Sequence, residues 1–99
     1  MEHRKFQNKR LVTIGVSERI PEVLQVLLRE LADGLEEQDY LQIFELRETE
    51  QGISLLHRQE VPPYESLGMV YGVKLTQPYE KVYIIDDVTH VTMLLAEEY

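Results

Sequence analysis

The chain has 99 residues, 43% of them hydrophobic and 28% charged, a composition that predicts one globular domain spanning residues 1–99. It contains no cysteine, which excludes disulfides and thiolate metal sites, and no apolar run of the roughly 18 residues that a membrane-spanning helix needs. The polar N-terminus has no secretory apolar segment. Together these features predict a cytoplasmic protein with no membrane partner.

The formal net charge is −8, and it is unevenly distributed along the chain. The first ten residues carry four basic groups and one acidic group, so they contribute +3 and the remainder contributes −11. We expect residues 1–8 to form a flexible basic tip before the first strand. Because phosphate backbones are bound mainly by clustered Lys and Arg, the acidic body is not expected to bind nucleic acid directly.

The N-terminal third predicts a strand followed by a helix. Segment 10–16 is rich in β-branched residues, which favours a first strand. Pro21 suits the first position of a helix, where its missing N–H is not needed. Leucines then recur at the spacing of one helical face, which predicts a helix over about residues 21–37. They are Leu24, Leu27, Leu28, Leu31 and Leu35.

The middle of the chain predicts a hairpin. Segment 40–47 has apolar side chains on both parities, which is typical of a central strand covered in part on both faces. Residues 50–52 end in glycine and predict a turn, after which segment 53–58 returns as the second strand. Pro62 and Pro63 then interrupt the sheet, because consecutive prolines cannot donate ladder hydrogen bonds.

The C-terminal part predicts further strands at 69–75 and 81–86. Segment 91–96 suits either a strand or a short helix, and a strand is favoured because a hairpin across residues 86–90 would pair it with the preceding strand. The fold class is therefore α+β. We predict one N-terminal helix packed on a mostly antiparallel sheet of about five or six strands, in the order β-α-β-β-β-β-β.

Three residues are candidates for an interaction surface. Val23 and Val26 lie away from the leucine face of the predicted helix, so they are expected to be exposed and to meet a partner or a second copy of the chain. The alternative is that they are isolated surface valines, which are common. Tyr64, beside the two prolines, is a candidate contact residue because tyrosine is enriched at interfaces; it also suits a half-buried strand.

Asp86 and Asp87 end a predicted strand, and their carboxylates suit either a contact site or a hard cation such as magnesium. A metal-dependent or acid/base enzyme would use these two residues with His57 or His90. The alternative is that the two acids close a turn through hydrogen bonds to the backbone. The sequence has no glycine-rich phosphate loop, nucleophile elbow or H-E-x-x-H helix, so no cofactor and no catalytic residue is predicted.

Several segments together resemble one known family. They are residues 8–16, 20–21, 39–46, 57–64, 85–87 and 92–99, with Asp-Tyr-Leu-Gln and Thr-Met-Leu-Leu-Ala-Glu-Glu-Tyr as the most specific blocks. The chain resembles a family of small proteins of low-GC Gram-positive bacteria described as "staphylococcal protein of unknown function". The resemblance implies a cytoplasmic bacterial protein with a single domain, and it supplies no reaction, cofactor or ligand.

Three hypotheses follow for the function. The first is a non-enzymatic module that binds a protein partner, with self-association as one form. The second is an acidic decoy that occupies the basic groove of a nucleic-acid enzyme, because carboxylates can imitate phosphate spacing. The third is the small metal-dependent or acid/base enzyme described above.

Overall fold

The computed structural model describes residues 9–99, so the predicted basic tip at residues 1–8 lies outside the described residues. Six strands form one sheet, and they are β1 (Lys9–Val12), β2 (Leu41–Glu48), β3 (Ile53–Gln59), β4 (Tyr64–Val70), β5 (Tyr79–Asp86) and β6 (His90–Leu95). The helices are α1 (Ile14–Arg19) and α2 (Glu22–Asp33), with a 3-10 turn, η1 (Ala96–Glu98), near the C-terminus. The α+β class is confirmed, with one more helix than predicted.

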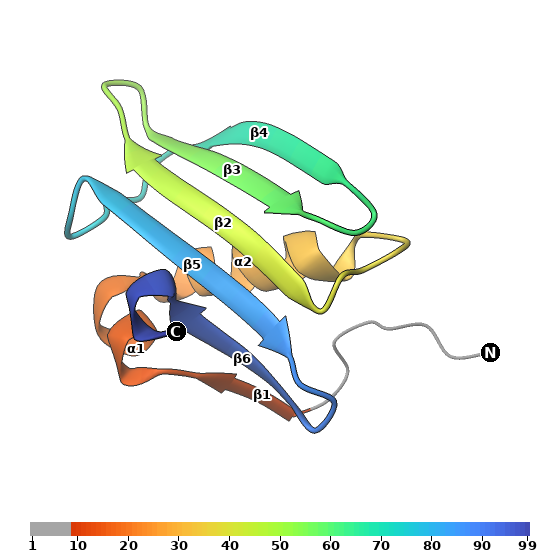
Figure 1. Ribbon diagram of the computed structural model, residues 1–99. Helices are drawn as coiled ribbons and strands as arrows, with labels where there is room; N and C mark the ends of the chain where they lie inside the picture. Colours follow the sequence, from red (N-terminus) through yellow and green to blue (C-terminus); the bar gives the residue numbers. More distant parts are fainter. Residues whose placement is uncertain (1–8) are drawn as a thin grey trace.

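The strand order across the sheet is β1-β6-β5-β2-β3-β4 (Figure 1). Neighbouring strands are antiparallel except β1 and β6, which are parallel. The central position predicted for residues 40–47 is confirmed, because β2 lies between β5 and β3. The strand preferred for residues 91–96 is also confirmed, since β6 pairs with β5 across a short turn.

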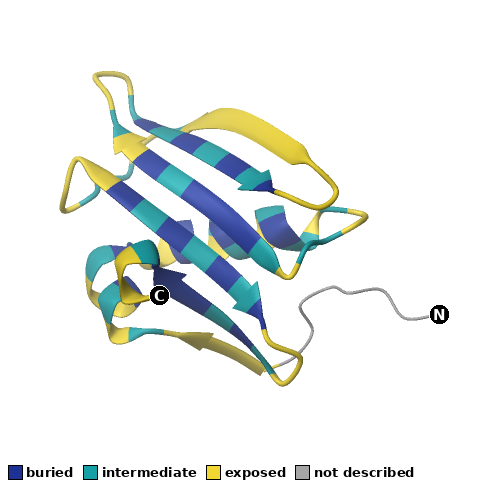
Figure 2. Ribbon diagram, in the orientation of Figure 1, coloured by how far each residue is buried: buried dark blue, intermediate teal, exposed yellow. Residues whose placement is uncertain are grey.

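The core lies between α2 and one face of the sheet. Helix α2 runs behind the strands in Figure 1, and Leu24 and Leu28 point from it into the core. Alternate residues of the inner strands meet them, so β2, β3 and β5 are striped in Figure 2. The largest of these core side chains include Phe44, Leu46, Ile53, Ile84 and Met93. Within residues 9–99, no helix is long and apolar enough to cross a membrane.

The first strand is shorter than predicted, because the chain turns into α1 after Val12. Thr13 begins this helix: its side-chain oxygen accepts a hydrogen bond from the backbone N–H of Val16 at 3.2 Å. The prediction of a strand through Val16 was wrong. It followed from the β-branched residues Ile14 and Val16, which favour a strand by propensity. Burial of Val16 against the core and the cap at Thr13 outweigh that preference.

Helix α2 ends at Asp33, four residues earlier than predicted. Gly34 follows it, and the backbone N–H of Gly34 donates to the carbonyl of Glu30 at 3.0 Å. The side-chain amide of Gln38 then donates to the Ala32 carbonyl at 2.6 Å. The last carbonyls of a helix need hydrogen-bond donors from outside it. For the Ala32 carbonyl, the Gln38 side chain supplies a donor, so a further helical turn is not needed.

The strand predicted at residues 69–75 begins earlier, at Tyr64, and ends at Val70. Gly72 has a φ of +80°, a left-handed conformation that ends the extended run. Val73 and Leu75 are partly buried against the core from the loop that follows. The alternating pattern Met69, Tyr71, Val73, Leu75 predicted one strand, but Val73 and Leu75 belong to a loop that packs on the core. The two prolines lie in the turn between β3 and β4.

Candidate functional site

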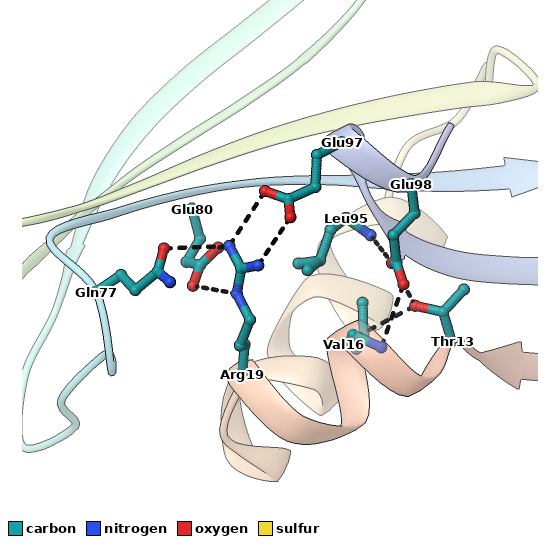
Figure 3. Close-up of polar contacts among 9 residues, drawn as sticks. Thr13, Val16, Arg19, Gln77, Glu80, Leu95, Glu97 and Glu98 are labelled. Atoms are coloured by element: carbon teal, nitrogen blue, oxygen red, sulfur yellow. Dashed lines mark hydrogen bonds and ion pairs between the residues drawn. The ribbon is translucent and has the colours of Figure 1, made fainter.

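A cluster of charged groups joins α1 to the sheet (Figure 3). The Arg19 guanidinium donates to both carboxylate oxygens of buried Glu80, at 2.6 and 3.1 Å, and to Glu97 at 2.9 Å. It also donates to the side-chain carbonyl of Gln77 at 3.2 Å. Glu80 first, and then Glu97, raise the pKa of Arg19 above its ordinary value. The single cation Arg19 is shared by the two carboxylates, so the cluster fastens α1 to β5 and η1.

Glu98 holds the start of α1 from the other end of the chain (Figure 3). Its carboxylate accepts hydrogen bonds from the Thr13 hydroxyl at 2.6 Å and from the backbone N–H of Gly15 at 3.2 Å. The backbone N–H of Leu95 donates to the same carboxylate at 2.8 Å. These bonds, that of Thr13 foremost, lower the pKa of Glu98. Carboxylates used in this way are not free to imitate phosphate, which weakens the support for the decoy hypothesis.

Asp86 and Asp87 close the turn between β5 and β6, as the alternative interpretation of these acids predicted. Asp87 Oδ1 accepts from the backbone N–H groups of His90 at 2.7 Å and Thr89 at 3.2 Å, and the His90 bond is the main cause of its lowered pKa. Asp86 is buried and accepts from the Val88 N–H at 3.0 Å. Both carboxylates thus stabilise a local turn.

The structure does not bring the four residues of the enzyme hypothesis together. His57 lies on β3, two strands away from β5, and Phe44 of β2 pairs with Val82, four residues before Asp86. His90 is adjacent to Asp87, but its ring Nδ1 lies 2.9 Å from the Thr89 hydroxyl. Among residues 9–99, no group of three or more His, Asp or Glu side chains is arranged to hold a metal ion.

Val23 and Val26 lie on α2 with 60% and 48% of their surface exposed. Residues four apart on a helix are neighbours, so Val23 continues a row through Leu27 to Leu31. Leu27 and Leu31 are partly buried against the core, which makes Val23 the exposed end of that row, with Val26 three residues further along the helix. The wheel position predicted for both valines agrees with their exposure; their role as contacts remains a prediction.

His57 is part of a buried polar network at one end of the sheet. Its Nε2 lies 2.7 Å from the side-chain carbonyl oxygen of Gln42, and its ring stacks on Phe44 at 4.4 Å between centroids. The Gln42 amide nitrogen donates to the Gln59 side chain at 2.6 Å. Tyr64, the first residue of β4, lies edge-on to the His57 ring at 5.3 Å. Tyr64 therefore has one side against this network and 38% of its surface exposed.

Strand β4 forms one edge of the sheet, and among the described residues no strand pairs with its outer side. It is exposed along almost its whole length (Figure 2), and Leu67 at its centre is 70% exposed. Edges are normally protected by Lys, Pro, bulges or short length. β4 is seven residues long, has no Lys or Pro, and pairs one-to-one with β3 without a bulge. The opposite edge, β1, has four residues, including Lys9 and Arg10.

Comparison with known proteins identifies the family. Residues 9–98 match the model of the family described as "Staphylococcal protein of unknown function (DUF960)". The chain belongs to this family. It is also similar to a solved structure, "Crystal structure of the protein of unknown function from Enterococcus faecalis", at 21% identity and a TM-score of 0.83, covering 100% of this chain and 97% of that one. No curated protein matches the chain.

The resemblance seen in the sequence is thus confirmed, and the likeness to the enterococcal structure shows a shared fold. Neither comparison assigns a reaction or a partner to this DUF960 member. Sequence reasoning included Tyr64 but missed Leu67 and the rest of the β4 edge. The alternation of residues 64–70 was the available signal, and it is weak because neither face of that strand is strongly apolar.

Proposed function

We propose that the protein is a non-enzymatic, self-associating interaction module of the bacterial cytoplasm, in which β4 pairs antiparallel with β4 of a second copy. The unprotected β4 edge carries this proposal. An exposed strand edge presents a row of backbone donors and acceptors that a further strand satisfies. The absence of cysteine supports the cytoplasmic location, because the cytoplasm is a reducing compartment in which disulfides are rare.

The sequence of β4 is self-complementary in a register centred on Leu67. In that register Leu67 faces Leu67 of the partner subunit, and each Glu65 faces a Met69 rather than another carboxylate. Directly opposed apolar pairs stabilise antiparallel strands, whereas directly opposed like charges destabilise them. A two-fold axis through Leu67 therefore creates apolar contacts without charge repulsion.

The same register produces a closed assembly. Two-fold pairing uses the same surface on both copies, so each β4 edge is covered once. The edges that remain are the two short β1 strands with Lys9 and Arg10, which disfavour further addition. We therefore expect a dimer with one continuous sheet and no larger polymer.

Sedimentation equilibrium on the wild-type chain and two variants tests the proposal. Leu67→Lys places two like charges opposite each other at the centre of the pair and is expected to give the 11.7 kDa monomer. Leu11→Lys makes the same chemical change on β1, where Leu11 is 39% exposed, and is expected to leave a dimer of twice that mass. A wild-type monomer at every concentration, or a Leu67→Lys dimer, would overturn the proposal.

The exposed valines supply a second test of the same assembly. A dimer built through β4 places both copies of α2 on one face of the joined sheet, with the two β4 strands between them. Val23 and Val26, which are exposed on α2, then lie on the same face as the helix of the partner subunit. Val23→Lys with Val26→Lys should therefore weaken assembly, by less than Leu67→Lys, without unfolding the chain. An unchanged dissociation constant would remove the valines from the interface.

A further inference from the structure

A cavity of about 180 Å³ lies between α2 and the β3–β4 edge of the sheet. Leu27 and Leu31 line it from the helix, Leu55 and His57 from β3, and Gly68 and Val70 from β4. The space exists because Gly68 has no side chain where β4 faces the helix. A Cβ added there would meet nothing within 4 Å. Most of this lining is apolar, and His57 is part of it.

The hydrogen bonds around His57 determine which of its ring nitrogens carries the proton. Gln42 is held with its amide nitrogen toward Gln59 and the Asp39 carbonyl, at 2.6 and 3.0 Å, so its oxygen is the atom that faces His57 Nε2. Nε2 must then carry the proton, and Nδ1 carries a lone pair. Within residues 9–99, the hydrogen bond to Gln42 is the one the structure gives this ring. His57 is only 2% exposed, and no hydrogen bond to its Nδ1 is found within residues 9–99.

We propose that this cavity binds a small aromatic molecule carrying one hydroxyl donor, with the ring among Leu27, Leu31 and Leu55 and the hydroxyl donating to His57 Nδ1. This inference does not rest on β4 pairing, and it adds ligand binding to the proposed assembly. The class of ligand follows from three features of the cavity: its size, its apolar lining and the acceptor nitrogen of His57.

The size admits one substituted benzene ring. An apolar protein cavity of roughly 150 Å³ is known to bind benzene, and this one is slightly larger. The acceptor determines the polar group, because a ligand without a donor would leave Nδ1 buried and without a partner. Burial lowers the pKa of His57 from 6.5 to about 4, so the ring is neutral near pH 7 and its lone pair is free to accept. Ser66 also lines the cavity and adds a second polar residue to it.

The test uses the full chain with p-cresol and toluene, two ligands that differ only in the hydroxyl group. Heteronuclear NMR reports the nitrogen resonances of the His57 ring and the methyl groups of Leu31 and Leu55. We expect both ligands to give contacts to these methyls, and p-cresol alone to move the Nδ1 resonance upfield as it gains a hydrogen bond. We expect p-cresol to bind about fivefold more tightly than toluene, the factor that one net hydrogen bond supplies.

Gly68→Val is the matched blocking variant. It fills the cavity from a position with open space and adds a residue that strands favour, so the fold is expected to persist and p-cresol binding to be lost. Leu67→Lys, one residue away on the outer face, is the control and should bind p-cresol as the wild type does. Because Leu67→Lys separates the copies while Gly68→Val does not, failure of dimerisation and failure of ligand binding are distinguished.

Several results would overturn the proposal. They are the absence of contacts between p-cresol and the Leu31 and Leu55 methyls in the wild-type chain, equal binding of p-cresol and toluene, or an Nδ1 resonance that does not move. Undiminished binding by a folded Gly68→Val variant would also overturn it, because the ligand would then occupy another place. The wild-type methyl contacts decide the matter even if Gly68→Val fails to fold.

Discussion

Two glycines near the β3–β4 edge lie in opposite surroundings. Gly52, in the turn between β2 and β3, has a φ of +156°, and a Cβ there would lie 2.6 Å from the Val70 carbonyl oxygen. Gly68 has open space at the same atom. The sequence does not show this difference, because the atom closest to a Cβ at Gly52 belongs to Val70, which is distant in the chain.

Substitution of these glycines by alanine therefore has different costs. Gly52→Ala should lower the free energy of unfolding by about 2 kcal/mol, because both the backbone conformation and the space oppose a Cβ. Gly68→Ala should leave it unchanged or raise it by about 0.5 kcal/mol, because alanine restricts the unfolded chain more than glycine does. Urea unfolding of the two variants measures both values, and equal losses would contradict the close approach of the Val70 carbonyl to Gly52.

His57 predicts a pH dependence of stability. Its pKa is lowered by burial from 6.5 to about 4, so between these values the unfolded chain binds a proton that the folded chain does not. The free energy of unfolding should be constant above pH 6.5 and should fall as the pH drops toward 4, by about 3 kcal/mol in total.

The control for this prediction is His57→Phe, which retains a ring against Phe44 and removes the titrating group. Glu98 and Asp87 also have lowered pKa values, so their contributions are lost too as the pH falls, in a more acidic range, and both chains share them. Between that acidic range and pH 6.5, the free energy of unfolding should rise with pH in the wild type and should not change with pH in His57→Phe. Identical slopes would show that His57 is not buried in the neutral form.

At the scale of elements, α1 depends on contacts that are distant in sequence. Six residues are too few for a stable isolated helix, so α1 relies on Thr13, on Glu98 and on the Arg19–Glu80 pair. α2, by contrast, has a leucine pattern that fixes its buried face locally. This explains why the longer helix was predicted from the sequence and the shorter one was not.

The pair between Arg19 and Glu80 should matter more for stability than most ion pairs at a surface. Glu80 is buried, so Arg19→Met leaves a charge without its main partner and should lower the free energy of unfolding by more than the loss of an exposed ion pair does. Arg19→Met combined with Glu80→Gln removes both charges and should recover a large part of this loss. Denaturant unfolding of both variants measures the difference, and an equal loss in the double variant would contradict the role given to the buried carboxylate.

At the scale of the whole molecule, local patterns predicted the class and most strands. The hairpin of β2 and β3, the central place of β2 and the strand at residues 90–95 all follow from short-range signals. The order of the strands depends on contacts between distant segments and does not follow from such signals. The start of β4 does not follow either, because neither face of this edge strand is apolar enough to give a clear alternation in the sequence. The β4 edge and the cavity behind it depend on that order, which is why Leu67 and His57 gained their proposed roles only from the structure.

The most direct test of the central claim is a mixing experiment with two charged variants at position 67. In the proposed register Leu67 faces itself across a two-fold axis, so Leu67→Lys and Leu67→Glu should each be monomeric when alone. When the two are mixed, opposite charges face each other, and sedimentation should show a one-to-one heterodimer that dissociates with salt. If the mixture remains monomeric while the wild-type chain is dimeric, the copies associate through another surface, and the pairing of β4 with β4 is contradicted.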